Sequence, residues 1–378
     1  MISCEQFFNI LNEHNLTFFT GIPDSTFKDL MKFLTDNQGE NFENIIACNE
    51  CEAIAIAAGY YLATNKIGVV YMQNSGFGKT INPLTSLCDP EIYSIPILLM
   101  IGWRGEPNKK DAPQHKKMGK ITLPLLETLQ IPYAILEPNA QKIEKEFNKA
   151  LQYFDKKKGP FALIFRRNFF QNYEMKRVIS NKYSLTTKEV IHLILNSLSK
   201  DEIIISNTGY ISRLLFEYRE SNEKDHYKSF YNIGSMGCAS SIGLGIALQK
   251  PQKRIIVFDG DGAAIMQMGA FSTIGKYSPT NFVHIIIDNE AHESTGSQPT
   301  NSSIIKFEDL AIASNYRWSI KIETKEQLLD SLDNIKNRDG PILILIKTKL
   351  HSALNLKRPN KLPKEYKEEF MKYLLDLS

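Results

Sequence analysis

The hydrophobic positions of the first half of the chain alternate between two spacings. Residues 7–11 place apolar side chains at helical spacing, and the apolar run 16–20 that follows indicates a strand ending in a Gly-Ile-Pro-Asp turn. Further strands are predicted at 44–47, 68–72, 97–101 and 161–165, with an alanine-rich helix over 50–63. Apolar runs that are each followed by a helix are typical of parallel strands covered on both faces. The first domain is therefore placed at residues 1–167.

The second half repeats this alternation. Because the apolar periodicity fades after residue 166, a linker is placed at 168–184. Thr186 and Glu189 then have the spacing of a capping box before an apolar helix over 190–198. Strands are predicted at 203–205, 254–258, 283–287 and 342–346, and an amphipathic helix near the C-terminus. The predicted fold class is α/β, with two doubly wound, mainly parallel-sheet domains, the second covering 185–378 with a C-terminal tail.

Length and composition agree with two globular domains. The 378 residues suit two hydrophobic cores better than one, and 43% of them are hydrophobic against 23% charged. A formal net charge of +3 argues against nucleic acid as a partner, which would require a large basic surplus. No signal peptide or membrane-spanning segment is expected. Five cysteines without disulfide-type spacing lead us to expect a cytoplasmic protein.

The most informative segment is Gly260-Asp261-Gly262, which follows one predicted strand, while Asp288 and Asn289 close the next. Carboxyl ends of parallel strands meet at the edge where open α/β sheets bind ligands. Glycines beside an acid allow backbone N–H groups to approach a diphosphate, and a hard divalent cation would join the acid to the phosphate oxygens. The tripeptide alone is better interpreted as a surface turn. Its context favours a diphosphate site, and no G-x-G-x-x-G motif supports a dinucleotide site.

This arrangement resembles the signature of thiamine-diphosphate-dependent decarboxylases, in which Gly-Asp-Gly is followed by asparagine after a spacer in the twenties. The resemblance implies a metal ion, Mg²⁺ or else Mn²⁺ or Ca²⁺, held by Asp261, Asn289 and the carbonyl of Ala291. It implies that thiamine diphosphate contacts a larger set of residues in this half: Thr208, Gly234, Met236, Gly260, Asp261, Gly262, Ala263 and Asn289. Met236 would hold the cofactor in a bent shape. Without the resemblance, it would be interpreted as an ordinary core residue that fills an irregular gap.

The resemblance further implies an activating glutamate in the other domain, at the start of an alanine-rich helix. Glu50 matches this position better than Glu52, because Asn49-Glu50 has the family's spacing to the Ala-Gly-Tyr of the helix. Glu50 would bond the aminopyrimidine ring and favour the tautomer that removes the thiazolium proton. By itself, such an acid would only interact with the helix dipole, worth ~0.3–1 kcal/mol. Cys48 and Cys51 form a C-x-x-C, which we interpret as packing rather than as a redox or zinc motif.

Most thiamine decarboxylases carry a third domain, for which this chain has no room, so it resembles their short two-domain form. Five segments carry this resemblance: 18–25, 71–76, 101–107, 112–115 and 289–300. It implies decarboxylation of a small anionic 2-oxo acid, with 3-phosphonopyruvate favoured and sulfopyruvate decarboxylation or carboligation as alternatives. A cofactor bound between domains of two subunits implies a homodimer or higher homo-oligomer. The alternative of another class is a non-catalytic protein that senses the cofactor.

An anionic substrate tail calls for cations and hydrogen-bond donors. Arg104, Lys109, Lys110 and His115 lie in one predicted loop, although each by itself is more often a solvated surface residue. Substrate contacts are expected from Asn74, Ser75, Arg104 and His115.

Proton transfer needs a group that titrates near neutrality. Candidates are His292, with Glu293 beside it, and His115. Glu290, where close relatives more often have glycine, adds a negative charge beside the metal loop.

Overall fold

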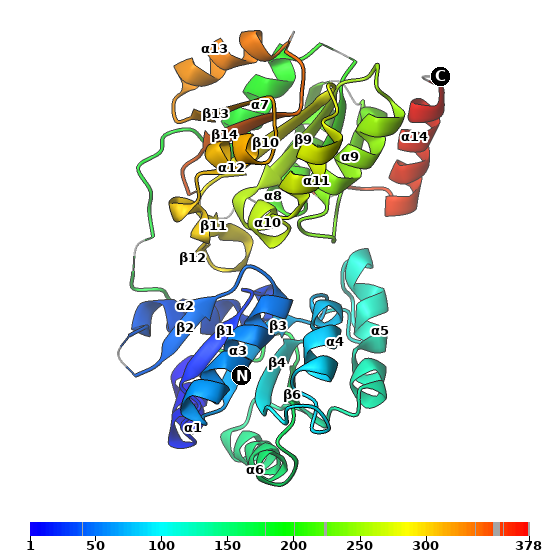
Figure 1. Ribbon diagram of the computed structural model, residues 1–378. Coiled ribbons are helices and arrows are strands. Elements are labelled where there is room, and N and C mark those ends of the chain that lie inside the picture. Colours follow the sequence, from blue (N-terminus) through cyan, green and yellow to red (C-terminus); the bar gives the residue numbers. More distant parts are fainter. Residues whose placement is uncertain are drawn as a thin grey trace. The chain divides into compact units, whose positions relative to one another are not determined.

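The computed structural model describes the chain except for residues 40, 178, 200, 223–224, 337, 351–355, 358 and 377–378. It forms two compact units, Met1–Val178 and Ile179–Ser378, each a parallel sheet flanked by helices (Figure 1). The predicted fold class is confirmed. The division falls inside the segment predicted as a linker, and the domain boundaries themselves stay predictions.

The first unit contains a six-stranded sheet in the order β2-β1-β3-β4-β6-β5, with all neighbours parallel. Its strands are β1 (Phe18–Gly21), β2 (Glu43–Ile46), β3 (Gly68–Gln73), β4 (Ile97–Gly102), β5 (Tyr133–Ile135) and β6 (Phe161–Phe165). Its helices are α1 (Cys4–Glu13), α2 (Lys28–Asn37), α3 (Glu50–Thr64), α4 (Phe77–Ser86), α5 (Pro113–Thr128) and α6 (Ala140–Lys157). The central strands are apolar throughout because helices cover both faces of the sheet.

Part of the segment predicted as a linker packs into the core of this unit. Phe169 and Phe170 are buried there, and the ring of Phe165 lies 4.8 Å from that of Phe169 between centroids. Ile2 forms a bridge with Phe170, which ties the segment to the start of the chain. These aromatic side chains show no helical or strand periodicity in the sequence, yet they are core residues, because an irregular segment can also bury large rings.

The second unit contains a six-stranded parallel sheet in the order β13-β14-β10-β9-β7-β8 and a two-stranded ribbon. The sheet strands are β7 (Ile203–Ser206), β8 (Ser229–Tyr231), β9 (Ile255–Gly260), β10 (Phe282–Asp288), β13 (Trp318–Ile322) and β14 (Ile342–Lys347), and the ribbon is β11 (Ala291–His292) with β12 (Gln298–Pro299). The helices are α7 (Thr187–Ser197), α8 (Tyr210–Asn222), α9 (Ala239–Gln249), α10 (Asp261–Met266), α11 (Ala270–Tyr277), α12 (Phe307–Ala313), α13 (Lys325–Ile335) and α14 (Pro363–Asp376). The predicted capping box is confirmed, since Thr186 and Glu189 each bond the other's backbone N–H at the start of α7.

The strand order of the second sheet reverses between β7 and β9. From β7 the chain passes to β8 on one side, whereas β9, β10 and β14 follow on the other. The register pairs Gly260 with Ile287 and Asp288 with Lys347, so these strands end at the same edge. A carboxyl edge at such a reversal is where open α/β sheets bind ligands.

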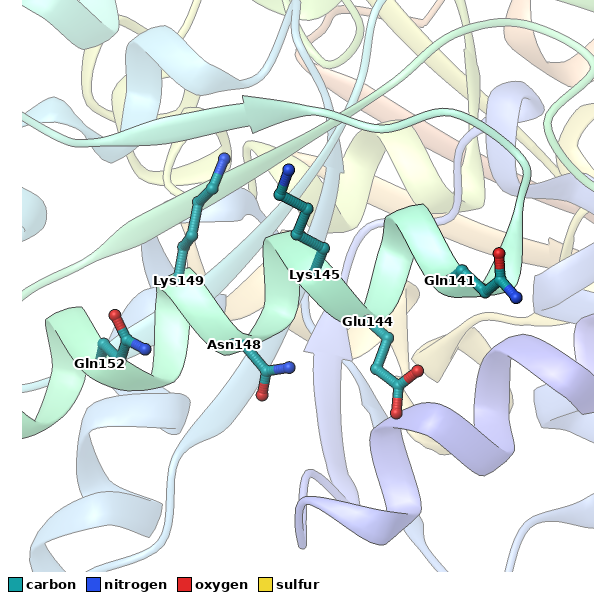
Figure 2. Close-up of a pocket in the computed structure, with 6 residues that line it drawn as sticks. All are labelled: Gln141, Glu144, Lys145, Asn148, Lys149 and Gln152. Carbon is teal, nitrogen blue, oxygen red and sulfur yellow. The ribbon is translucent and has the colours of Figure 1, made fainter.

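Within the described residues, no helix has the length and apolar character needed to cross a membrane. A hollow on α6 is lined by polar residues of that helix alone, as Figure 2 shows: Gln141, Glu144, Lys145, Asn148, Lys149 and Gln152. None of these residues belongs to the motifs described above, so the hollow adds nothing to the candidate site.

Candidate functional site

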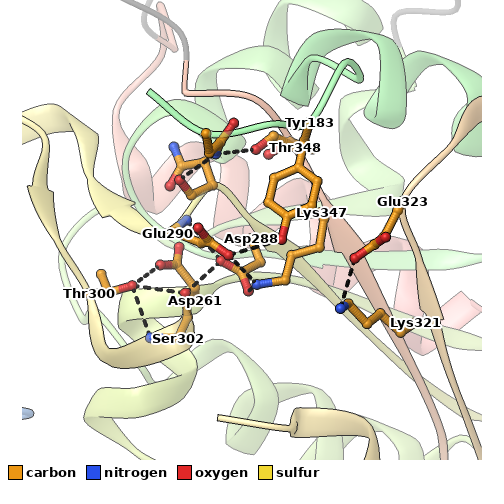
Figure 3. A network of polar contacts seen from close by, with 12 residues as sticks. Tyr183, Asp261, Asp288, Glu290, Thr300, Ser302, Lys321, Glu323, Lys347 and Thr348 are labelled. Carbon is orange, nitrogen blue, oxygen red and sulfur yellow. Dashed lines mark hydrogen bonds and ion pairs between the residues drawn. The ribbon is translucent and has the colours of Figure 1, made fainter. Parts of the chain in front are cut away.

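Asp261 is the first residue of α10, directly after β9, and its side chain is buried. The hydroxyl of Thr300 donates a hydrogen bond to its carboxylate (Figure 3). Burial, and then the charge of Asp288, raise the pKa of Asp261 to about 8. Among the described residues, no cation is paired with this carboxylate. A buried acid without a positive partner is costly, and a bound cation would remove that cost.

Asn289 follows β10 and begins a turn that leads into the ribbon. Its Oδ1 accepts a hydrogen bond from the backbone N–H of Ala291 at 3.1 Å, and its Nδ2 donates to Glu293 Oε2 at 2.9 Å. Ala291 pairs with Pro299 in the ribbon. These contacts hold the turn beside the end of β9, where the two predicted loops meet as expected.

The donors at this edge suit a hard divalent cation. Asp261 offers a carboxylate, Asn289 an amide oxygen and Ala291 a carbonyl, which are the oxygen ligands that Mg²⁺ and Ca²⁺ prefer. In the part of the chain that the structure describes, no three or more His, Cys, Asp or Glu side chains gather to hold a metal. Protein groups alone would therefore leave the cation incompletely coordinated, and diphosphate oxygens could complete its shell. The assignment of these metal ligands stays a prediction.

Gly262 brings two further predicted residues to the same loop. A Cβ atom at this position would lie 2.9 Å from His292 Cε1 and 3.4 Å from Met236 Cε. Any larger residue would push the His292 ring away, so the glycine allows close packing. The structure thus brings together the Gly-Asp-Gly loop, Met236, which we expect to hold the cofactor in a bent shape, and His292, a candidate for proton transfer.

Thr208 and Gly234 lie in the loops after β7 and β8. The Thr208 hydroxyl donates to the carbonyl of Ile233 at 3.1 Å, which ties the two strand ends together. The backbone N–H of Met236 donates to the carbonyl of Gly234 at 3.2 Å, which leaves that oxygen a second lone pair. These residues therefore belong to the same carboxyl edge as Asp261, while their contacts with a cofactor stay predictions.

His292 differs from our expectation in its protonation. Burial lowers the pKa of His292 to about 4, so the ring is neutral at pH 7 instead of titrating near neutrality. A neutral imidazole still accepts one hydrogen bond and donates another. Its catalytic role stays a prediction.

Glu50 is the first residue of α3 and is 6% exposed. Glu52, the alternative, is engaged elsewhere, because its carboxylate accepts a hydrogen bond from the backbone N–H of Cys48. The Glu50 carboxylate lies against Gly76, which precedes α4, and Lys79 Nζ lies 3.5 Å from its Oε2. That spacing is longer than a hydrogen bond, so the Glu50 carboxylate keeps an ionic contact and remains available to a ligand.

Sequence reasoning missed Gly76 and Lys79. Both lie in the Gly-Phe-Gly-Lys segment that follows β3, and a lysine in a glycine-rich turn at a strand end was the available signal. Their contact with Glu50 joins residues that are distant in sequence, so no local pattern points to it. In the described structure, neither Cys48 nor Cys51 forms a disulfide.

Arg104 is paired within its own loop, and its predicted contact with the substrate stays a prediction. Its Nε and Nη2 donate to the two oxygens of Asp111 at 2.9 and 2.6 Å, and its Nη1 donates to Ser25 Oγ at 2.8 Å. The paired nitrogens that would bind a phosphonate are therefore occupied. Although burial by itself raises it, hydrogen bonds from Arg104 and from two backbone N–H groups hold the pKa of Asp111 well below its usual range.

Asn74 is wholly buried, and its predicted contact with the substrate stays a prediction. Its Nδ2 donates to the carbonyl of Arg104 at 2.8 Å and to Thr122 Oγ1 at 2.9 Å, so it fixes the loop after β4. Ser75 is exposed and donates to Gln73 Oε1 at 2.8 Å. His115 is half-buried in the first turn of α5. Of the four predicted substrate residues, Ser75 and His115 are the two that the described contacts leave most open to a ligand.

Comparison with known proteins bears on both units. Residues 3–122 match the N-terminal, and residues 207–346 the C-terminal, thiamine pyrophosphate binding domain of thiamine pyrophosphate enzymes. The chain is 29% identical to a phosphonopyruvate decarboxylase of Streptomyces viridochromogenes, over 95% of this chain and 91% of that protein. It is equally identical to one of Streptomyces hygroscopicus, over 99% and 94%. A sulfopyruvate decarboxylase subunit beta of Methanococcus maripaludis is 37% identical over 50% of this chain and 96% of that protein.

Proposed function

This chain belongs to the thiamine pyrophosphate enzymes, and we propose that it decarboxylates 3-phosphonopyruvate to phosphonoacetaldehyde and carbon dioxide. The choice of substrate rests on the likeness, over nearly the whole chain, to two phosphonopyruvate decarboxylases. A catalytic role, rather than mere sensing of the cofactor, is supported by the burial of Glu50, the residue that we assign as the activating acid.

We assign the binding of the cofactor to the two strand edges described above. Asp261, Asn289 and the carbonyl of Ala291 would hold a divalent cation, most simply Mg²⁺. The backbone of Gly260, Gly262 and Ala263 would face the diphosphate, and Thr208, Gly234 and Met236 would contact the rings. Glu50 would bond the ring nitrogen of the aminopyrimidine.

Thiamine diphosphate, when bound, supplies an electron sink for the bond that breaks as carbon dioxide leaves. The protein's part is to place and move protons. Glu50 is held between Gly76 and Lys79, where it can keep a proton at the ring nitrogen. His292 is neutral at pH 7 and packs on Gly262, where it can accept or relay a proton, and His115 is the second candidate.

The anionic tail of the substrate calls for a cation near the reacting centre. Lys79 is 37% exposed and approaches Glu50, so its ammonium group lies next to the acid that would meet the cofactor. We infer that Lys79, rather than Arg104, attracts the phosphonate, because Arg104 is engaged by Asp111. Ser75 and His115 would add hydrogen-bond donors.

The direct test is carbon dioxide release from 3-phosphonopyruvate by the unmodified protein and by Glu50→Gln. We expect turnover by the unmodified protein with thiamine diphosphate and Mg²⁺, and its loss in Glu50→Gln while calorimetry still detects cofactor binding. Full activity in Glu50→Gln would contradict the assignment of the activating acid. Binding of the cofactor without carbon dioxide release from any 2-oxo acid would favour a sensor protein instead.

Sulfopyruvate is the second candidate substrate. The 37% identity to a sulfopyruvate decarboxylase subunit over half of the chain supports it, and sulfonate presents a similar oxygen arrangement with a smaller charge. Steady-state kcat/KM for 3-phosphonopyruvate, sulfopyruvate and pyruvate would separate the candidates. We expect the phosphonate to be favoured, and equal turnover of pyruvate would count against an anion-specific site.

Assembly and location complete the proposal. We propose a homodimer or a higher homo-oligomer, because in this family the cofactor lies between the first domain of one subunit and the second domain of another. A cytoplasmic location is supported by the five cysteines, which are all free thiols.

A further inference from the structure

Lys347, the last residue of β14, is buried against two acids of the metal loop. Its Nζ lies 2.7 Å from Asp288 Oδ2 and 2.8 Å from Glu290 Oε1 (Figure 3). The lysine side chain is 5% exposed and that of Asp288 is fully buried. Because Asp288 and Lys347 face each other in the register of β10 and β14, the sheet itself fixes this pair. A buried ion pair held on two strands has little freedom to rearrange.

Asp288 is linked to Asp261 through two hydroxyl groups. The Thr300 hydroxyl donates to Asp261 and lies 3.1 Å from Ser302 Oγ, which in turn donates to Asp288 Oδ1 at 2.8 Å. The two carboxylates are thus linked through hydrogen bonds rather than in direct contact. In the described structure, however, the ammonium of Lys347 is bound to one of the two, and Asp261 is left without a cation.

Glu290 is compensated by the same lysine. Its backbone has φ of +63°, a conformation that glycine adopts more easily, and its N–H donates to Asp288 Oδ1 at 2.9 Å. Its carboxylate receives the Lys347 ammonium and a hydrogen bond from the Tyr183 hydroxyl at 3.1 Å. The extra negative charge that we noted in the sequence therefore does not face the metal site uncompensated.

We propose that Lys347 takes the place of a second cation at this edge, and that it thereby makes binding of the divalent metal depend on the diphosphate. This inference rests on the proposed function. While Lys347 neutralises Asp288, a free metal ion meets one carboxylate, one amide oxygen and one carbonyl, and cation affinity rises with the number of charged ligands. The diphosphate of the cofactor supplies the missing negative oxygens. Lys347 is in this sense a positioning residue, which allows the metal to bind only together with its cofactor.

The test measures metal binding without activity, by electron paramagnetic resonance titration of free Mn²⁺ into protein that lacks thiamine diphosphate. Lys347→Met leaves the negative charge of Asp288 without its cation beside the metal loop, so the Kd for Mn²⁺ should fall at least about tenfold. The gain in Mn²⁺ affinity on adding thiamine diphosphate should shrink by the same factor. Lys321→Met is the matched control, because Lys321 pairs with Glu323 at 2.8 Å on the neighbouring strand and is 38% exposed. The control should bind Mn²⁺ like the unmodified protein.

Circular dichroism would establish that each variant is folded, and Lys347→Gln, which keeps an amide donor for the buried acids, replaces Lys347→Met if the latter does not fold. A Kd for Mn²⁺ that is unchanged or higher in the folded Lys347 variant overturns the inference. A similar fall in Lys321→Met also overturns it, because general loss of positive charge would then explain the result. If the unmodified protein shows no thiamine-dependent carbon dioxide release, the proposed function is wrong. The Mn²⁺ titration does not measure activity, so its result tests the role of Lys347 independently of that outcome.

Discussion

The carboxylate of Glu50 lies so close to the backbone of Gly76 that a methyl group at position 76 would overlap it. Glu50 begins α3 and Gly76 precedes α4, two helices that pack against each other in the first unit. The missing side chain at position 76 therefore leaves room for the acid in its buried position. This relationship makes the placement of Glu50 sensitive to a residue that does no chemistry itself.

Gly76→Ala should lower kcat for carbon dioxide release by roughly 100-fold, the order expected when a catalytic group is displaced by ~1 Å. Gly78→Ala is the matched control. No atom lies within 4 Å of a Cβ built at Gly78, and alanine in the first turn of α4 should be neutral or slightly stabilising. Steady-state kinetics of both variants, with thermal unfolding as a check on the fold, decide the matter. Equal activity of the two variants would show that Glu50 tolerates displacement.

Lys79→Met should raise KM for 3-phosphonopyruvate roughly tenfold more than KM for pyruvate. Removal of a cation 3.5 Å from Glu50 weakens attraction of the doubly charged tail, and solvent screening limits the effect. Lys66→Met, an exposed lysine just after α3, is the control and should change neither constant. A similar loss with both substrates in Lys79→Met would point to a role in activating the cofactor rather than in recognising the anion.

Removal of divalent metal by a chelator should abolish carbon dioxide release, and added Mg²⁺ should restore it. In Asp261→Asn the affinity for Mg²⁺ with thiamine diphosphate should fall by at least about 100-fold, since an amide replaces the one charged protein ligand. Calorimetric titration of the chelator-treated protein gives this affinity directly. Unchanged affinity in Asp261→Asn would remove this residue from the proposed metal site.

Asp111→Asn should destabilise the first unit by about 3 kcal/mol at pH 7, because Arg104 would lose its partner in a largely buried pair. The pKa of Asp111 is lower in the folded protein than its ordinary value of 3.8, so the carboxylate contributes its full stability above that pH. As the pH falls below about 4 toward the lower folded pKa, this contribution is lost. The difference between Asp111→Asn and the unmodified protein should therefore be constant from about pH 5 to 8 and shrink below about pH 4.

Urea unfolding checks this dependence. The protein has two tryptophans, one in each unit, so fluorescence in a Trp318→Phe background reports on Trp103, next to Arg104. Glu137→Gln breaks an exposed pair in the same unit, with Lys142, and should leave the free energy of unfolding nearly unchanged. A difference for Asp111→Asn that stays constant down to pH 3 would contradict the argument.

Local pattern was enough to predict most elements of the fold. The strands around Ile203, Ile256 and Ile285 are mainly apolar runs, and the Thr186–Glu189 capping box needs only the spacing of two residues. The choice of Glu50 over Glu52 came instead from the resemblance to thiamine-diphosphate-dependent decarboxylases, and it stays a prediction. The strand and capping-box predictions depend on residues within one turn or one strand of one another, so the sequence contains the necessary information.

The contacts that decide what the candidate residues can do required the tertiary structure. Whether Arg104 is open to a substrate depends on Asp111 and Ser25, and whether the charge of Glu290 matters depends on Lys347, which is contributed by a strand far along the chain. Sequence by itself determined which segments form strands, helices and ligand-type loops, because periodicity and capping are local properties. The folded loops and the register of the strands decided which charges neutralise each other, because those pairings arise only when the tertiary structure brings the side chains together.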